Sequence, residues 1–145
     1  MKNIPIGQIL VENGFLKEDQ LEEALEKQRS EPGKKLGDVL LELGYVSETQ
    51  LAQALSIRLK VPFIDLTTTK IDIEAVKKIP EAIAKKNCCV AFQMNDSRLT
   101  VATDDPINFY IFEELKVISG MEIHAMIATR TAINETISRH IRSRP

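Results

Sequence analysis

The N-terminal part of this chain contains the same sequence pattern twice, thirty residues apart. The first copy runs from Ile6 to Gln28 and the second from Leu36 to Arg58. A repeat of this length usually corresponds to one supersecondary unit whose apolar face has to be covered by its neighbour. Nine positions are identical in the two copies: Gly7/Gly37, Leu10/Leu40, Glu12/Glu42, Gly14/Gly44, Glu18/Glu48, Gln20/Gln50, Leu21/Leu51, Ala24/Ala54 and Leu25/Leu55. Two copies predict either a small helical bundle or two equivalent surfaces suited to a two-fold symmetric ligand.

Each copy predicts a short helix, a glycine turn and a longer helix. In copy one, apolar residues recur at helical spacing in both segments: Ile6, Ile9 and Leu10, then Leu21, Ala24 and Leu25. Gly14 lies between them, where helices often close with a residue in the left-handed backbone conformation. Copy two repeats this plan, and Ser47 is expected to cap its longer helix. We therefore expect residues 1–60 to form a helical subdomain of two tandem helix-turn-helix repeats.

The pattern changes after Lys60, and residues 61–145 predict a second subdomain. Strands are expected at 89–94, 99–103 and 122–127, the first two joined by a hairpin turn at 95–98. Residues 61–66 are expected to form an edge segment, since Pro62 suits only an edge strand. Helices are expected at 73–78, 80–86 and 129–141, and from Asp105-Pro106 to Gly120. The expected fold class is α+β: a four-helix unit, then a small three-stranded sheet with packed helices.

The composition is that of a soluble globular protein, because 43% of the 145 residues are hydrophobic and 28% are charged. The net charge of −2 gives no reason to expect affinity for nucleic acid. No apolar run approaches the roughly 20 residues that a bilayer crossing requires, and the N-terminus lacks the apolar segment of a signal peptide. The adjacent Cys88 and Cys89 have no distant cysteine to pair with. We therefore expect a cytoplasmic protein with reduced thiols and no membrane insertion.

The sequence shows little sign of catalysis. Gly33-Lys34-Lys35 resembles a nucleoside-triphosphate loop only superficially, because the upstream Gly and the following Ser or Thr are missing. The two histidines, His124 and His140, have no metal-ligand spacing to another His, Cys or acidic residue. The expectation is a domain that is not an enzyme and has neither a metal ion nor a catalytic residue.

The doubled pattern resembles the N-terminal domain of the type II secretion and type IV pilus assembly ATPases. The subfamily that binds cyclic di-GMP carries two tandem motifs of the form Arg-Leu-Gly-x-x-Leu-Leu-x-x-Gly-Leu-Leu-x-x-x-x-Leu-x-x-x-Leu-x-x-Gln. The positions that match the first motif are Gly7, Leu10, Gly14, Phe15, Leu16, Leu21, Leu25 and Gln28. Those that match the second are Lys35, Leu36, Gly37, Leu40, Gly44, Tyr45, Val46, Leu51 and Leu55. Residues 59–66, 99–102 and Asp105-Pro106 resemble later landmarks of the same family.

This resemblance implies cyclic di-GMP as the ligand, with one GMP unit held by each copy, and no cofactor. The ligand-binding residues that it implies are Ile6, Gly7, Leu10, Gly14, Phe15, Gln28, Lys35, Leu36, Gly37, Leu40, Gly44, Tyr45, Arg58 and Asp105. The leading Arg of the motif is Pro5 in copy one and Lys35 in copy two, and the closing Gln is Gln28 and then Arg58. Arg binds a guanine edge or a phosphate through two hydrogen bonds, whereas Lys offers a point charge and Pro offers no donor.

Some of these residues have two interpretations on the sequence alone. Gly7 and Gly37 either let a flat, anionic ligand approach backbone N–H groups or allow close helix packing. Asp105 either caps the helix that follows Pro106 or reaches the ligand from the second half of the chain.

Two functions are consistent with the sequence. The first is a regulatory domain that senses cyclic di-GMP for a motor protein, with an ATPase domain in the same chain if this sequence is an excised part. The second is a docking module that needs no nucleotide. Its partner would be the cytoplasmic domain of an inner-membrane secretion or pilus platform protein. In both cases we expect the domain to lie in the cytoplasm and to reach the inner membrane only through its partners.

Overall fold

A computed structural model describes residues 5–106 and 109–141 of the chain. The chain divides into two compact units, Met1–Lys60 and Val61–Pro145. The described part of the first unit is helical, and the second combines helices with a small sheet. The predicted α+β fold class is confirmed.

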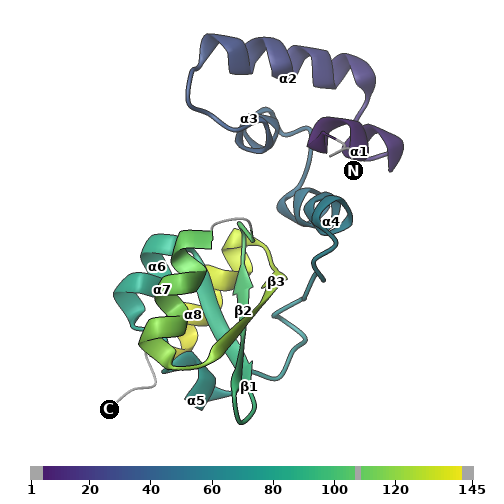
Figure 1. The fold of residues 1–145 in the computed structure, drawn as a ribbon. Coiled ribbons are helices and arrows are strands. Elements are labelled where there is room, and N and C mark those ends of the chain that lie inside the picture. The colour runs from purple at the N-terminus through teal and green to yellow at the C-terminus, as the bar shows by residue number, and fades with distance from the viewer. Residues whose placement is uncertain (1–4, 107–108, 142–145) are drawn as a thin grey trace. The chain divides into compact units, whose positions relative to one another are not determined.

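The first unit contains, in its described part, two short and two long helices in alternation (Figure 1). The short helices are α1 (Ile6–Glu12) and α3 (Leu36–Leu43), and the long helices are α2 (Glu18–Ser30) and α4 (Glu48–Leu59). Each pair of helices comes from one copy of the repeat, as the sequence predicted.

Both short helices end in the same way. Gly14 and Gly44 have φ angles of +75° and +74°, which glycine adopts without the steric cost that a Cβ atom would cause. The N–H group that follows each glycine then reaches back over the last turn. Phe15 donates to the carbonyl of Leu10 at 2.9 Å, and Tyr45 donates to that of Leu40 at 3.1 Å. These hydrogen bonds satisfy carbonyl groups that a helix end leaves without a partner.

The long helices also begin alike. The Ser47 hydroxyl accepts a hydrogen bond from the Gln50 N–H at 3.1 Å, and the Ser47 N–H donates to the Gln50 side chain at 3.0 Å. This reciprocal pair is a capping box, so the predicted cap at Ser47 is confirmed. At the equivalent place in copy one, the Lys17 N–H donates to the Gln20 side chain at 3.0 Å.

The helices of the two copies pack against each other in an exchanged arrangement, in which each copy's short helix contacts the other copy's long helix. Helix α1 packs mainly against α4, and α2 packs mainly against α3, so each short helix lies on the long helix of the other copy. The buried core has the same equivalence, since it consists of Ile9 with Val39, Leu10 with Leu40, Leu16 with Val46 and Ala24 with Ala54. Every buried residue of copy one in this core therefore has its counterpart, thirty positions later, in the same core.

The second unit contains, among its described residues, a three-stranded sheet in the order β1-β2-β3. Strands β1 (Cys89–Met94) and β2 (Arg98–Thr103) form an antiparallel hairpin, and β3 (Glu122–Ile127) pairs with β2 in parallel. The helices are α5 (Ile73–Val76), α6 (Glu81–Asn87), α7 (Phe109–Ser119) and α8 (Arg130–Ile141). Figure 1 shows α6, α7 and α8 together beside the sheet, where Leu99 and Val101 pack in one buried core with Leu115, Ile133 and Ile137.

Two predicted elements are shorter than expected. Residues 61–66 lie at the edge of the sheet beside β3, as expected, but a single bridge pairs Phe63 with Ile127 in place of a full strand. Ile64 donates to the Ile127 carbonyl and Ile127 donates to the Pro62 carbonyl, both at 2.8 Å. Pro62 has no N–H group to continue the ladder, and the preceding Lys60 has a left-handed φ of +57°, which turns the chain away from an extended path. Helix α5 stops at Val76 rather than 78, because Lys78 and Ile79 donate to the carbonyls of Ala75 and Val76, three residues back, instead of continuing the helical pattern.

Candidate functional site

The first turns of α1 and α3 lie next to each other in the first unit. A Cβ atom added to Gly7 would lie 3.4 Å from the Leu36 Cδ2 atom. Ile6 and Leu36, the first residues of the two helices, both pack against the shared core. The first N–H groups of a helix have no partner within it and carry a partial positive charge. Two equivalent helix starts therefore meet at one place in the fold.

Gly7 and Gly37 both make room for a leucine of the following long helix. A Cβ atom at Gly7 would lie 2.6 Å from Leu21 Cδ1, and one at Gly37 would lie 3.0 Å from Leu51 Cδ2. Real Cβ atoms essentially never approach another atom to 2.6 Å, whereas 3.0 Å is a tight contact that a small shift of Leu51 relieves. This geometry supports the interpretation that these glycines allow close packing.

The apolar residues that were expected to offer surface to the ligand are not equivalent. Leu10 and Leu40 are fully buried at 0% exposure, because each lies in the centre of the shared core. Neither side chain is exposed to solvent in this structure, so their expected contact with a ligand stays a prediction. Phe15 and Tyr45 are partly buried at the two corners, each beside an exposed glycine, Gly14 or Gly44.

The polar residues of the predicted site lie at the helix ends. The Gln28 side chain donates to the Lys34 carbonyl at 3.0 Å, so the end of α2 is joined to the residues that precede α3. Lys35 is exposed at the N-cap of α3. Arg58 is exposed in the last turn of α4, the helix that packs against α1. Gln28 therefore lies near the start of α3, the short helix that packs against α2. Arg58 lies on α4, the long helix that packs against α1.

The structure adds a charged cluster beside this region that the sequence did not predict. Glu42 forms ion pairs with Lys34 and with Lys27, the latter at 3.7 Å. The hydrogen bond from Lys34 holds the pKa of the Glu42 carboxyl below its ordinary value, and the same bond raises the pKa of Lys34. The repeat has the same residue at the equivalent position, Glu12, and this identity is the sequence signal that could have drawn attention to Glu42.

A second feature that the sequence missed joins the two copies through side chains. The Tyr45 hydroxyl lies 2.8 Å from both carboxylate oxygens of Glu23 on α2. This hydrogen bond raises the pKa of the Tyr45 phenol above its ordinary value. Copy one has Phe15 and copy two has Gln53 at the equivalent positions, so this contact is made once only.

Asp105 belongs to the second unit and follows β2. Its N–H donates to the Thr103 hydroxyl at 3.1 Å, and the neighbouring Asp104 forms an ion pair with Arg130 at 3.0 Å. Helix α7 is described from Phe109, and residues 107–108 lie outside the described residues, as does any cap on them. Asp105 and the other predicted site residues therefore belong to different units, and its expected contact with the ligand stays a prediction.

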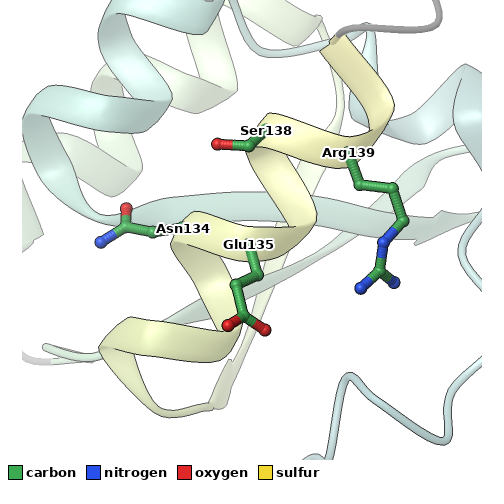
Figure 2. A pocket seen from close by; sticks show the side chains of 4 residues that line it. All are labelled: Asn134, Glu135, Ser138 and Arg139. Atoms are coloured by element: carbon green, nitrogen blue, oxygen red, sulfur yellow. The ribbon is translucent and has the colours of Figure 1, made fainter.

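Two surface hollows lie in the second unit and include none of the predicted site residues. Figure 2 shows one of about 510 Å³, where Asn134, Glu135, Ser138 and Arg139 all project from the single helix α8. The other, of about 650 Å³, lies where the start of α5 meets the end of β1 and is lined by residues 70–74 with Gln93 and Met94. Ligand sites normally combine an apolar wall with convergent polar groups from several elements, and the hollow on α8 has only one element.

The described residues contain no group of three or more His, Cys, Asp or Glu that could hold a metal ion. Within the same residues, none of the helices has the length and the apolar character that a bilayer crossing requires.

Comparison with known proteins places these features in context. The family model of the MshEN domain matches residues 59–145. A solved structure of MshE with cyclic di-GMP is 33% identical and has a TM-score of 0.79, covering 94% of this chain and 99% of that chain. The N-terminal domain of XpsE has a TM-score of 0.71 and covers 96% of this chain and 98% of that one. At 23% identity it supports the fold alone.

A curated relative extends the comparison to a whole protein. The type IV pilus assembly ATPase PilB of Myxococcus xanthus (strain DK1622) is 30% identical over 135 residues. The match covers 93% of this chain but 24% of that protein, so the chain spans about a quarter of the length of this relative.

Proposed function

The chain belongs to the MshEN domain family, whose members include N-terminal domains of pilus assembly and secretion ATPases, and on this premise we propose that its first unit binds cyclic di-GMP. The two copies of the repeat would each hold one GMP unit. The domain would be a cytoplasmic, non-catalytic regulatory module, and ligand binding would change how an attached or associated ATPase works.

The observation that carries this proposal is the meeting of the α1 and α3 starts at Gly7 and Leu36. Cyclic di-GMP is two-fold symmetric, and its two phosphates are anionic. An exchanged pair of repeats with an equivalent core would place two similar surfaces around one centre. Helix starts are suited to anions because their N–H groups point outward and the helix dipole is positive there.

The exchanged packing supports a way in which the site would accommodate the departures from the family motif. The start of α1 has Pro5, which brings no charge, but the covering helix α4 brings Arg58. The start of α3 has Lys35, and the covering helix α2 brings the neutral Gln28. Each half of the proposed site therefore contains one cation. If each half were instead formed by the two helices of a single copy, the first half would contain Pro5 and Gln28 and would have no cation.

The apolar contacts would come from residues that are only partly covered. Ile6 and Leu36 flank the centre, and Phe15 and Tyr45 lie at the corners, where flat side chains can pack against a base. Leu10 and Leu40 support these residues from the core. The contribution of Asp105 from the second unit remains a prediction.

Calorimetric titration with cyclic di-GMP tests this proposal, with GMP as the control ligand. We expect saturable heat with one dinucleotide per chain. Gly37→Glu should abolish it, because a carboxylate would stand at the start of α3. Ser97→Glu adds the same charge to an exposed hairpin of the second unit and should leave binding unchanged. Absence of heat up to about 1 mM ligand in a folded sample, equivalent to binding weaker than about −4 kcal/mol, would reject the proposal.

A second candidate function, docking to the cytoplasmic domain of an inner-membrane platform protein, is supported by the surface of α7. Three of the large apolar side chains that are exposed in the described residues lie on this one helix: Tyr110, Val117 and Ile118. Clustered apolar side chains on a surface commonly mark an interaction site. A pull-down of the platform domain by this chain, with and without cyclic di-GMP, tests this function separately.

A further inference from the structure

The solvent face of α7 carries an apolar ridge. Tyr110 is 92% exposed and Val117 is 83% exposed. Residues seven apart lie within about 20° of each other around an α-helix, so these two side chains form one line along the helix. A helix that only covers a sheet has polar residues on this face.

The opposite face of α7 already satisfies the fold. Ile111 and Leu115 are buried at 5% and 0% exposure, and both belong to the core of the second unit. The ridge therefore adds nothing to the packing of this unit.

Two carboxylates flank the ridge. Glu113 and Glu114 follow Tyr110 by three and four residues, so they lie on either side of the line from Tyr110 to Val117. Both are exposed, and within the part of the chain that the structure describes no ion pair is formed by either of them. The face thus combines apolar surface with unneutralised negative charge.

This arrangement determines the chemistry of a partner. An apolar line between two acidic margins complements a helix whose apolar residues recur every seven positions and are flanked by Lys or Arg, as in the margins of a coiled coil. A second copy of the same face fits poorly, because four carboxylates would meet across the contact. Tyrosine at the centre of such a contact supplies large apolar area with little loss of conformational freedom.

We propose that α7 is a docking face for a basic amphipathic helix of a partner protein, anchored by Tyr110 and Val117 and oriented by Glu113 and Glu114. This inference rests on the docking role proposed above and is independent of cyclic di-GMP. It names the surface and the chemical character of the partner segment.

Two synthetic helical peptides test this surface directly. Both carry Leu at heptad positions, and one has Lys and Arg at the flanking positions while the other has Glu. Fluorescence anisotropy with the whole chain should show binding of the basic peptide that weakens as salt is raised, and no binding of the acidic peptide. Chemical-shift changes caused by the basic peptide should centre on α7.

Variants then separate the apolar from the charged contribution. The double change Tyr110→Ser with Val117→Ser should weaken the basic peptide by at least about tenfold. The double change Glu113→Lys with Glu114→Lys should reverse the preference, so that the acidic peptide binds. Ile73→Ser on α5 removes another exposed apolar side chain, 44% exposed, and should change neither affinity. All these sites are exposed, so circular dichroism should report unchanged folding.

The results separate two claims: that α7 is a docking surface, and that the platform protein is the partner that docks. Equal binding of the basic peptide to wild type and to both double variants, or self-association through α7, would overturn the proposal. If the platform domain is captured equally by wild type and the α7 variants, docking is correct and this surface is wrong. If the peptide results hold while the platform domain is not captured, the surface is correct and the proposed partner is wrong.

Discussion

The Tyr45 hydroxyl donates a hydrogen bond to the carboxylate of Glu23, with both oxygens at 2.8 Å, and so links the corner of the second repeat to the long helix of the first. This contact follows from the exchanged packing of α2 against α3. It also breaks the equivalence of the two copies, because Phe15 at the matching corner has no hydroxyl to donate.

The first prediction concerns the pH dependence of this contact. Glu23 raises the pKa of Tyr45, so the bond stabilises the folded state fully below the unfolded value of about 10. The stabilisation should be lost as pH rises through the higher folded pKa, where the phenolate would face the carboxylate. Urea unfolding of wild type and Tyr45→Phe should therefore show a small excess stability of wild type at pH 7 that disappears above pH 10.

The control for this prediction is Tyr110→Phe, which changes a phenol that is 92% exposed in the other unit. It should give no pH-dependent difference from wild type. A Tyr45→Phe difference that stays constant from pH 7 to pH 11 would show that the hydrogen bond is not its source.

The second prediction concerns the packing of the two glycines. Gly37→Ala should be close to neutral, since the gain in helix propensity of about 1 kcal/mol offsets a mild contact with Leu51. Gly7→Ala should destabilise by about 1 kcal/mol relative to Gly37→Ala, because its Cβ would lie 2.6 Å from Leu21. Equilibrium unfolding in urea measures both. Combining Gly7→Ala with Leu21→Ala should be less than additive, and strict additivity would exclude this contact as the cause.

The third prediction concerns the distribution of charge between the two halves of the proposed site. Arg58→Ala and Lys35→Ala should each weaken cyclic di-GMP by roughly tenfold, because each removes the one cation of its half. Pro5→Arg added to Arg58→Ala should restore binding, since the new arginine would start the helix that Arg58 is proposed to serve. Calorimetry measures the affinities, and Arg98→Ala, an exposed arginine of the other unit, is the matched control. Failure of Pro5→Arg to rescue would argue against the exchanged assignment.

The fourth prediction concerns the backbone at Lys60, which has a φ of +57° at the end of α4. A left-handed conformation costs a residue with a side chain about 1–2 kcal/mol, and glycine avoids this cost. Lys60→Gly should therefore stabilise the first unit by up to about 1 kcal/mol after the larger entropy of the unfolded glycine is counted. Thermal or urea unfolding measures the change. Lys77→Gly, at a helix end with a φ of −69°, should destabilise or have no effect.

The fifth prediction concerns the two thiols. Burial, with a smaller effect of Asp104, raises the pKa of both Cys88 and Cys89 to about 12. At pH 8 the reactive thiolate should be scarcer than in an unfolded chain by roughly a thousand-fold, so Ellman's reagent should react slowly with the native protein and rapidly in denaturant. Because the folded pKa is raised, stability from these groups is present below pH 9 and falls as pH approaches 12. Cys88→Ser and Cys89→Ser assign the rates, and fast native reaction would contradict their burial.

Local patterns predicted most of the elements, because the forces that create them act over a few residues. The strand bounds Cys89–Met94 and Glu122–Ile127 agree with the sequence pattern, as does the cap at Ser47. The segment around Pro62 pairs at the edge of the sheet, as expected, but only through a single bridge, since its pairing depends on where Ile127 lies and on the left-handed turn at Lys60. Neither condition is visible in the composition of residues 61–66.

The predicted site was harder to obtain from the sequence. Motif matching named Leu10 and Leu40 as contacts because they are identical in both copies, yet identity at these positions reflects the shared core. The sequence predicts that Glu23 is part of a solvated helix face, and its contact with Tyr45 has no local signal, because its counterpart in copy two is Gln53 and Tyr45 is 22 residues away in the chain.

The sequence by itself determined that two equivalent helical units exist, since the thirty-residue repeat carries the same apolar spacing, glycine turns and helix starts in both copies. It did not determine which helix covers which. The apolar faces of α1 and α3 are so alike that either long helix satisfies the same pattern. Only the tertiary structure decided this, because contacts within one copy, such as Leu21 beside Gly7 and Leu51 beside Gly37, are alike in both copies, and the packing between copies depends on the path of the connecting turns.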